Sequence, residues 1–423
     1  MVEVTFRDQN GRGHRAPRRD LFPLGAAISL ADLDHDPHPW LARLRDTEPV
    51  SWLPALNGWL VTRHALAVAV MRDTATFTVD DPRFTTARVV GPSMLSLDGT
   101  AHGRHRAAFT KGFGRGEIHA RLAGFVTAEA NRLVAGMRPA GSGDVRRSLA
   151  GPLAVAVVAQ ALGLGDTDPR TVLDWYTAIV GSVSALAGEH GSAGTGTGGR
   201  DQVATAGAEA FGSLSARLSA VIGLADGPAS LLAAAVRTSP DGAGSGLSTG
   251  EVISNAAVIM FGGIETTEGM ISNVILHLLR HPAQLALVRA DPDLVPNAVE
   301  ESLRLEPAAA VVDRYATRDV TFGGAAIRRG DLVIVSLAGA GRDPAVFTDP
   351  GTFDVRRPNA RLNLAFAHGP HFCLGAHLAR LEAQAAVRAA LTLPELRLDP
   401  AHPASPRGLV FRKPPSLRVR WAA

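Results

Sequence analysis

One long, uninterrupted helical pattern from Thr249 to Arg280 does most to limit the folds open to this chain. Ser248 and Glu251 have the spacing of a capping box, in which each side chain bonds the backbone N–H of the other residue. His281 and Pro282 end the pattern, because proline disfavours helical backbone in the residue before it. At about 1.5 Å per residue, such a helix would be roughly 50 Å long. We therefore expect it to cross the whole molecule.

Helical patterns dominate the remainder of the chain, and strand-like patterns are few. Helices are predicted over residues 41–44, 118–137, 200–224 and 297–305. Strands are predicted at 58–62, at 409–412 and 417–421, and at 320–327 and 331–336, the last two as a hairpin around residues 328–330. The sequence thus predicts a mainly α-helical protein with a small β portion.

We expect one folded catalytic domain over residues 23–423, preceded by a flexible basic tail over residues 1–22. No nucleic-acid-binding motif accompanies the basic residues of that tail, so no nucleic-acid partner is expected. The Gly-rich segment 188–200 is predicted to be a flexible loop. Within it, residues 194–199 match the dinucleotide pattern G-x-G-x-x-G, but no strand precedes them and no acidic residue supports them. No NAD or flavin module is therefore expected.

The overall composition is that of an ordinary globular protein, with 423 residues, 46% of them hydrophobic, and a formal net charge of +3. The single cysteine excludes a disulfide within the chain and a zinc site built from cysteines. The most apolar stretch, residues 253–279, is interrupted by Glu265 and Glu268, so we expect no membrane span. We find no signal-peptide pattern and expect a cytoplasmic protein.

The single cysteine, Cys373, is the first candidate for chemistry. A lone buried cysteine is commonly a small hydrophobic residue with no further role. Here Gly369 and Gly375 flank it, and leucines at helical spacing follow it, so it should lie at the N-terminus of a helix. The free N–H groups and the dipole at such a terminus stabilise a thiolate. That thiolate could attack a substrate or bind a metal.

Residues 366–375 read Phe-Ala-His-Gly-Pro-His-Phe-Cys-Leu-Gly and resemble the haem-binding signature F-x-x-G-x-x-x-C-x-G of the cytochrome P-450 family. The resemblance implies a triangular single-domain cytochrome P-450 fold, with the long helix over a haem b group. Cys373 would be the axial ligand of the iron. Phe366 would shield its sulfur, His371 would contact a haem propionate, and Gly375 would allow close approach of the haem. Ala367 departs from the family's usual glycine.

Two further motifs resemble the same family. Glu301 and Arg304 match its E-x-x-R motif, and Arg357 resembles the third member of a buried ion network behind the haem. Taken alone, Glu301 and Arg304 could be an ordinary surface pair three residues apart on a helix.

His102 and Arg106 match the family's H-x-x-x-R motif, which binds haem propionates, and Arg314 resembles a further propionate ligand. Charge-assisted pairing with carboxylates is what such residues do well. Taken alone, His102 and Arg106 could form a solvated basic helix face.

The motif Gly262-Gly263-Ile264-Glu265-Thr266 lies in the middle of the long helix. Two glycines in a helix interior cost about 1 kcal/mol each relative to alanine, so a reason for them is expected. The family motif [AG]-G-x-[DE]-T resembles this stretch, and small residues there open space for O₂. The resemblance implies that Thr266 organises oxygen and water, while Glu265 relays protons. Glu268 is an additional acid that could pair with a base or extend that path.

A substrate pocket is expected around the same part of the long helix, although each lining residue could equally be plain core. The expected lining residues are Met94, Leu95, Val258, Phe261, Gly262, Ala309, Ala310 and Val410.

The implied activity is a monooxygenase that uses O₂ to oxidise, and above all hydroxylate, a small organic molecule, in bacterial secondary metabolism. Electrons from NAD(P)H would arrive through a ferredoxin or flavodoxin with its reductase, and we expect a monomer. Basic residues on the cysteine side of the haem would attract such acidic partners. Two alternatives stay open: an atypical oxidation such as coupling, desaturation, nitration or decarboxylation, and a haem protein that recruits partners without catalysis.

Overall fold

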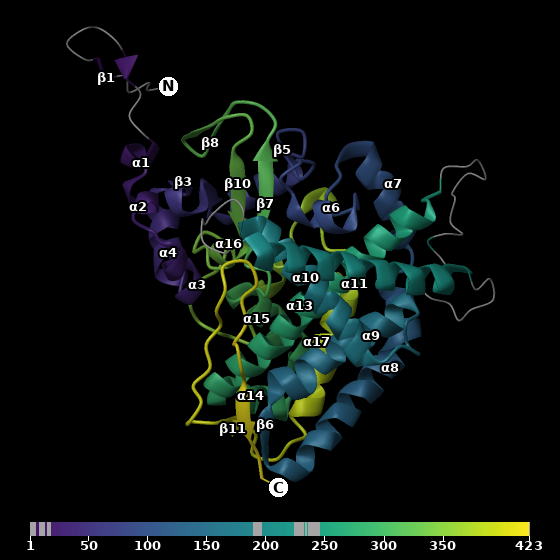
Figure 1. Ribbon diagram of the computed structural model, residues 1–423. Coiled ribbons are helices and arrows are strands. Elements are labelled where there is room, and N and C mark those ends of the chain that lie inside the picture. Colours follow the sequence, from purple (N-terminus) through teal and green to yellow (C-terminus); the bar gives the residue numbers. More distant parts are fainter. Residues whose placement is uncertain are drawn as a thin grey trace.

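The computed structural model describes residues 6–7, 13–14, 18–188, 197–223, 232, 235 and 246–422. The helix α13 (Thr249–Arg280) runs through the middle of the molecule (Figure 1). Its first turn carries the predicted capping box, since the Ser248 N–H donates to Glu251 Oε2 at 2.8 Å and the Ser248 hydroxyl accepts from the Glu251 N–H. It ends at Arg280, as predicted.

The structure is mainly helical, which confirms the predicted fold class. Its other helices are α1 (Arg18–Leu21), α2 (Pro23–Ala26), α3 (Leu30–His35), α4 (His38–Thr47), α5 (His64–Arg72), α6 (Thr85–Val90), α7 (Gly99–Thr110), α8 (Arg115–Met137), α9 (Gly151–Leu162), α10 (Pro169–Gly188), α11 (Thr197–Gly223), α14 (Pro282–Ala290), α15 (Val295–Leu305), α16 (Leu337–Ala340) and α17 (Ala376–Ala390). Its strands are β1 (Phe6–Arg7), β2 (Gly13–His14), β3 (Val50–Leu53), β4 (Gly58–Val61), β5 (Phe77–Thr78), β6 (Ser142–Asp144), β7 (Val311–Ala316), β8 (Val320–Phe322), β9 (Ala325–Ile327), β10 (Leu332–Ser336), β11 (Arg397–Leu398) and β12 (Arg418–Arg420).

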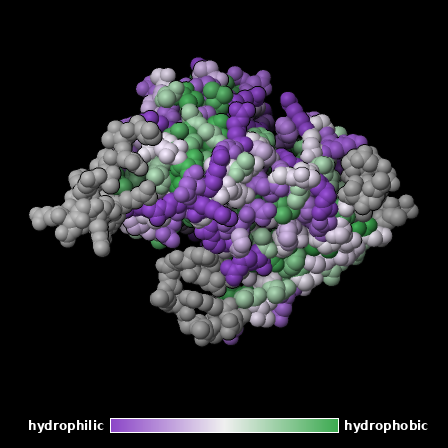
Figure 2. Space-filling view, turned by 90° about the horizontal axis from the view of Figure 1, so that it is seen from above, coloured by the Kyte–Doolittle hydropathy of each residue, from purple (hydrophilic) through white to green (hydrophobic). Residues whose placement is uncertain are grey.

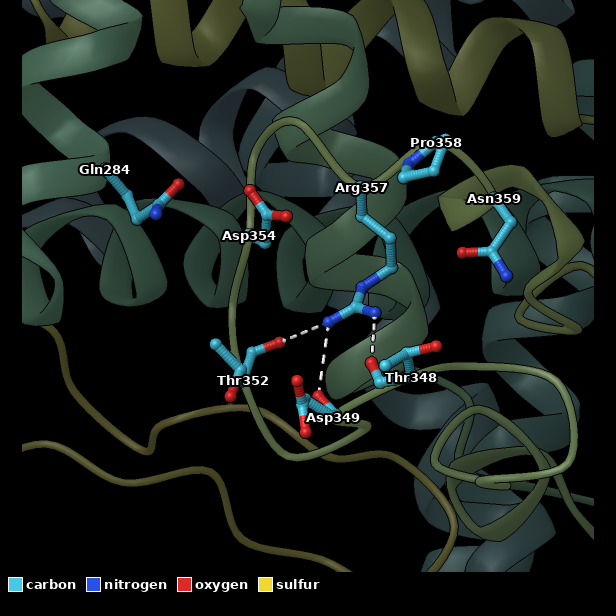
Figure 3. Close-up of a pocket in the computed structure, with 8 residues that line it drawn as sticks. All are labelled: Gln284, Thr348, Asp349, Thr352, Asp354, Arg357, Pro358 and Asn359. Atoms are coloured by element: carbon cyan, nitrogen blue, oxygen red, sulfur yellow. Dashed lines mark hydrogen bonds between the residues drawn. The ribbon is translucent and has the colours of Figure 1, made fainter.

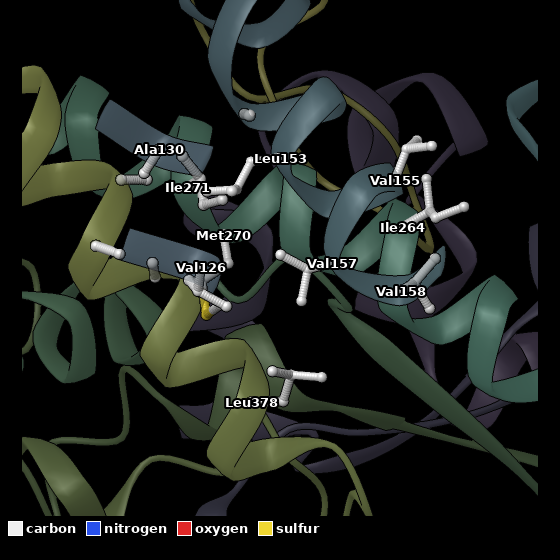
Figure 4. Packing of buried hydrophobic residues seen from close by; sticks show 14 of the residues in the cluster. Val126, Ala130, Leu153, Val155, Val157, Val158, Ile264, Met270, Ile271 and Leu378 are labelled. Carbon is white, nitrogen blue, oxygen red and sulfur yellow. The ribbon is translucent and has the colours of Figure 1, made fainter. Parts of the chain in front are cut away.

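The main hydrophobic core surrounds α13. Apolar side chains of α9 and α17 pack against it, and α8 packs against α9 and α17, in one cluster whose members include Val126, Leu153, Ile264, Ile271 and Leu378 (Figure 4). Since α13 is covered by other helices along most of its length, most of its residues are buried. The prediction that this helix crosses the molecule therefore agrees with where the core lies.

A five-stranded sheet lies beside the helices, in the order β3-β4-β10-β7-β5. Strands β4 and β10 are parallel, with Val333 opposite Trp59, and the other neighbours in the sheet are antiparallel. The predicted hairpin between residues 320–327 and 331–336 is wrong. Strand β8 pairs with β9 through the turn at Gly323-Gly324, and β10 instead joins the larger sheet. Both glycines have positive φ, which the tight turn requires.

Three other expectations need adjustment. Residues 409–412 form only an isolated bridge between Phe411 and Ala309 rather than a strand. Most of the predicted Gly-rich loop 188–200 and of the tail 1–22 falls outside the described residues. The end of that expected tail is packed, because Arg18 on α1 forms an ion pair with Asp331 at 2.7 Å and lies 4.4 Å above the Trp52 ring.

Seen from the top of Figure 1, the surface mixes hydrophilic and hydrophobic residues (Figure 2). Among the described residues, no helix combines the length and the apolar character needed to cross a bilayer.

The packing around α13 leads to a stability prediction. Ile271 has no exposed surface and lies within the cluster drawn in Figure 4. We expect Ile271→Ala to lower the free energy of unfolding by about 2–5 kcal/mol, because it leaves a cavity. Leu173→Ala, at a position that is 43% exposed, should change it by about 0.5 kcal/mol or less. Urea unfolding of both variants measures the difference, and equal losses would contradict the packing described.

Candidate functional site

Cys373 lies in a short loop between a turn at Gly369–His371 and the first residue of α17. Its backbone N–H donates to the Phe366 carbonyl at 2.8 Å, which closes the loop. The helix thus begins three residues after Cys373 rather than at it, so the sequence prediction of a helix N-terminus is right to within one turn. The Cys373 sulfur is therefore positioned both by this hydrogen-bonded loop and by the start of α17.

Two residues of this loop have left-handed backbone conformations. Gly369 has a φ of 73°, and a Cβ there would lie 2.6 Å from the Met71 carbonyl oxygen, so only glycine fits. Ala367 has a φ of 59°. That conformation costs a residue with a Cβ roughly 1–2 kcal/mol. The departure from glycine at residue 367 therefore places backbone strain beside the candidate ligand.

Cys373 is a free cysteine with exposed surface. Burial raises the pKa of the Cys373 thiol, while a bond from the Gly375 backbone and the charges of Arg106 and Arg380 oppose that rise. Arg380 also lies 4.3 Å above the ring of Phe366. Phe366 is the residue whose carbonyl closes the Cys373 loop. A metal ion bound to the Cys373 sulfur would replace the thiol proton, because the thiolate is the form that binds metals.

The candidate propionate ligands carry unsatisfied donors. His102 and Arg314 are both buried, and His102 Nε2 and Arg314 Nε have no hydrogen-bond partner among the described residues. Burial, with the nearby charges of His371 and Arg106, lowers the pKa of His102 to about 4. Burial also lowers the pKa of Arg314. Buried polar atoms are almost always paired, so these two call for acceptors, and the two carboxylates of a haem would supply them. The residues present fit that group.

His371 pairs with a carboxylate of the protein. Its Nε2 lies 2.8 Å from Asp98 Oδ1, and its ring lies 4.3 Å from the His102 ring. Asp98 also accepts hydrogen bonds from the Thr78 hydroxyl and the Val79 N–H. Burial alone would raise the pKa of Asp98, but the bonds from His371 and Thr78 lower it. No local sequence pattern indicates this pair, because its two members are far apart in the chain.

The middle turn of α13 borders open space on one side. Val258, Phe261, Gly262 and Thr266 are partly exposed there, although most residues of the helix are buried. Gly262 and Gly263 occupy this turn for different structural reasons. A Cβ at Gly262 would meet nothing within 4 Å, whereas a Cβ at Gly263 would lie 2.9 Å from Val158 on α9. One glycine therefore borders the space, and the other allows close helix packing.

Both acids of this turn are ion-paired. Lys413 Nζ lies 2.7 Å from Glu265 Oε1 and also pairs with Glu268. Arg146 Nε lies 2.7 Å from Glu268 Oε1, and the Tyr176 hydroxyl donates to Glu265 Oε2. Glu268 therefore pairs with two bases, Arg146 and Lys413. The sequence predicted that Glu268 could pair with a base but not which one.

The expected pocket residues come from segments that the structure brings together. The Met94 N–H donates to Asn255 on α13 at 2.8 Å, and the Ala310 N–H donates to the Val410 carbonyl at 2.8 Å. Met94 and Ala310 themselves are buried in core clusters. The remaining expected residues are partly or fully exposed, namely Leu95, Val258, Phe261, Gly262, Ala309 and Val410.

Phe411 joins this group, because its ring lies 5.6 Å from that of Phe261. Val410 is among the predicted lining residues, whereas Phe411 is not.

Glu301, Arg304 and Arg357 form a buried ion network. Arg304 Nε and Arg357 Nε lie 2.7 and 3.0 Å from the Glu301 carboxylate, and neither Glu301 nor Arg304 has exposed side-chain surface. Arg357 also donates to the backbone carbonyls of Thr348, Asp349 and Thr352 (Figure 3). A cavity of about 520 Å³ lies beside Arg357, but none of the expected pocket residues lines it. The network therefore braces a loop rather than a ligand.

Comparison with known proteins gives matches along most of the chain. A family model described as Cytochrome P450 matches residues 224–417. The Cytochrome P450 monooxygenase PikC of Streptomyces venezuelae is 36% identical, covering 98% of this chain and 97% of that protein. Nocardicin C N-oxygenase of Nocardia uniformis subsp. tsuyamanensis is 33% identical, covering 95% of this chain and 98% of that protein. The crystal structure of P450BioI in complex with an acyl carrier protein ligated to hexadec-9Z-enoic acid has a TM-score of 0.80 at 27% identity, covering 92% of this chain and 100% of that chain.

This similarity extends far beyond the cysteine loop and includes the fold around it. It implies haem as the cofactor, O₂ as a co-substrate, a small-molecule substrate and a redox partner. The unsatisfied donors at His102 and Arg314 agree with haem as the cofactor. The chain belongs to the cytochrome P-450 family and is a monooxygenase.

Proposed function

We propose that this protein hydroxylates a small organic molecule of bacterial secondary metabolism, with electrons supplied by a ferredoxin or flavodoxin. The single observation that carries the proposal is the pairing of Glu265 with Thr266 on the partly exposed middle turn of α13. An acid beside an alcohol at that place suits controlled proton delivery. Two relatives, named for PikC and for the N-oxygenation of nocardicin C, support the assignment to secondary metabolism.

A haem at this site would be held by Cys373, with its propionates near His102, Arg106 and Arg314. When bound, it supplies the one-electron and O₂ chemistry that side chains cannot perform. The role of the chain is to place hydrogen-bonding groups and protons. Thr266 Oγ1 donates to the Gly262 carbonyl at 2.5 Å. Because this bond uses the only hydroxyl proton, the Thr266 oxygen can only accept a further hydrogen bond. It would hold a water, or another group that carries a hydrogen, over the pocket.

Glu265 would carry protons from the solvent side of α13 towards Thr266. Its side chain is 18% exposed, so it touches both solvent and the interior. A carboxylate accepts a proton at one oxygen and releases it from the same or the other oxygen, which makes it a suitable carrier. The two residues are adjacent on the helix, and one water could bridge them.

The redox partner would bind on the cysteine side of the molecule. Arg72 and Arg115 are exposed, and their charges act on His368 and His377, which lie on either side of Cys373 in the chain. Phe372, next to Cys373, is 40% exposed. A positive rim around an apolar centre attracts acidic partners such as ferredoxins, and it shortens the path to the sulfur.

The first test concerns Thr266. A ligand is first found by screening compounds for a shift of the haem Soret band from low to high spin. With that ligand, Thr266→Ala should keep the thiolate haem spectrum but lose product per NADPH by about tenfold or more, with the electrons recovered as hydrogen peroxide. Thr266→Ser, which keeps the hydroxyl, is the matched control and should stay coupled. Unchanged coupling in the alanine variant would contradict the role given to Thr266.

The second test concerns the partner surface. Arg72→Glu and Arg115→Glu should each raise the KM for a ferredoxin by about threefold to tenfold at low salt, because the attraction is electrostatic and screened by salt. Arg329→Glu, at an exposed position between β9 and β10, serves as the control for net charge. Stopped-flow reduction at two ionic strengths measures the effect. A KM that rises equally in all three variants would count against this surface.

A further inference from the structure

The cations of this chain are almost all arginines. Of 43 lysine and arginine residues, only Lys111 and Lys413 are lysines. Lys111 is exposed after the last turn of α7, whereas the Lys413 side chain is only 11% exposed. A buried lysine in a chain that otherwise uses arginine needs a local reason. Lysine differs from arginine in having a compact ammonium with three donors, which can also lose its proton.

The surroundings of Lys413 give that reason. Its ammonium pairs with Glu265 and Glu268, two acids three residues apart on the same face of α13. The cluster is completed by Tyr176 from α10 and Arg146 from the turn before α9. Burial, followed by the charge of Glu265, raises the pKa of Tyr176 well above its usual value, so this hydroxyl stays a donor.

Both carboxylate oxygens of Glu265 are therefore engaged. Oε1 accepts from Lys413 and Oε2 accepts from Tyr176. Each of these contacts fixes one oxygen of Glu265 and turns it towards its partner, away from other donors. Proton transfer through Glu265 is therefore favoured when one of the two contacts opens and frees that oxygen. Lys413 is the partner that can leave Glu265 and still keep an ion pair, because it also pairs with Glu268.

The position of Lys413 depends on the segment 407–413, which we call the pocket loop. Backbone hydrogen bonds join Arg407 and Lys413 at its two ends. Between them lie Val410 and Phe411, which belong to the proposed pocket wall. On the other side, a Cβ at Gly269 of α13 would lie 3.6 Å from Lys413 Cβ, so the loop lies close against the helix.

We propose that Lys413 is a positioning residue that couples substrate binding to proton delivery by holding Glu265 until a substrate contacts the pocket loop. Asn273 holds the backbone beside Lys413 in place, so a substrate that presses on Val410 and Phe411 shifts the flexible Lys413 side chain, and the ammonium then pairs with Glu268 alone. Glu265 is released on that side and can take up a proton. This inference rests on the proposed function, because it assumes that Glu265 carries protons.

The two lysines allow a test that does not depend on turnover. The haem-loaded protein is treated with deuterated acetic anhydride, and mass spectrometry follows acetylation of Lys413, with Lys111 as the internal reference. Only an unprotonated, accessible amine reacts, so Lys413 should react more slowly than Lys111 by about tenfold or more. Adding 4-phenylimidazole, which binds haem iron and fills the pocket, should raise the Lys413 rate relative to Lys111. Equal rates for both lysines, or a ratio that the azole leaves unchanged, would overturn the coupling.

A second arm uses variants, each first checked for an intact reduced-CO spectrum and thermal midpoint. Lys413→Met should change the solvent isotope effect on NADPH oxidation and its pH profile, whereas Lys111→Met should change neither. Lys413→Arg keeps the positive charge, and it replaces Lys413→Met as the test variant if the methionine variant does not fold. Since arginine has a different shape and stays protonated, it should still shift the pH profile. If Thr266→Ala uncouples the enzyme while both Lys413 variants match the parent, the inference fails and the proposed function stands. If Thr266→Ala has no effect, the proposed function fails first.

Discussion

A helix that passes through the centre of a protein must find partners on every side, and α13 meets this constraint differently along its length. Along much of its length it is packed by apolar side chains of α9 and α17. Its middle turn uses one glycine for packing and one to border open space. The second half also anchors distant segments, since Asn273 donates to the backbone carbonyls of Glu306 and Arg412. The fold, the proposed oxygen site and the proton path therefore all depend on one continuous element.

Features encoded within a few residues could be predicted from the sequence, and pairings between distant segments could not. The capping box of α13, the cysteine loop and the glycines of the middle turn are local patterns with local causes. The predicted partner of β10 is wrong because the sheet pairs it with β7, on the other side of the β8–β9 hairpin, and with β4, which is distant in the chain. For the same reason, the sequence named Glu265 and His371 as candidates but gave neither Lys413 nor Asp98 as a partner.

The region around Cys373 is incompletely satisfied by the protein alone. His102 and Arg314 each leave one buried nitrogen without a partner, and an unpaired buried donor costs about 1–3 kcal/mol. Strain at Ala367 adds to this cost. A haem that bonds these donors stabilises the folded chain by mass action, since only the folded chain can bind it at this site. Loading the protein with haem should therefore also raise its free energy of unfolding.

The preference for arginine over lysine also bears on alkaline conditions. Guanidinium groups stay charged at any pH that proteins encounter, so the network of Glu301 with Arg304 and Arg357 keeps its charges as the pH rises. A lysine ammonium, in contrast, loses its proton at high pH. Within the described part of the chain, Glu265 is thus ion-paired with a cation of the type that alkali can neutralise, whereas Glu301 is paired only with guanidinium groups.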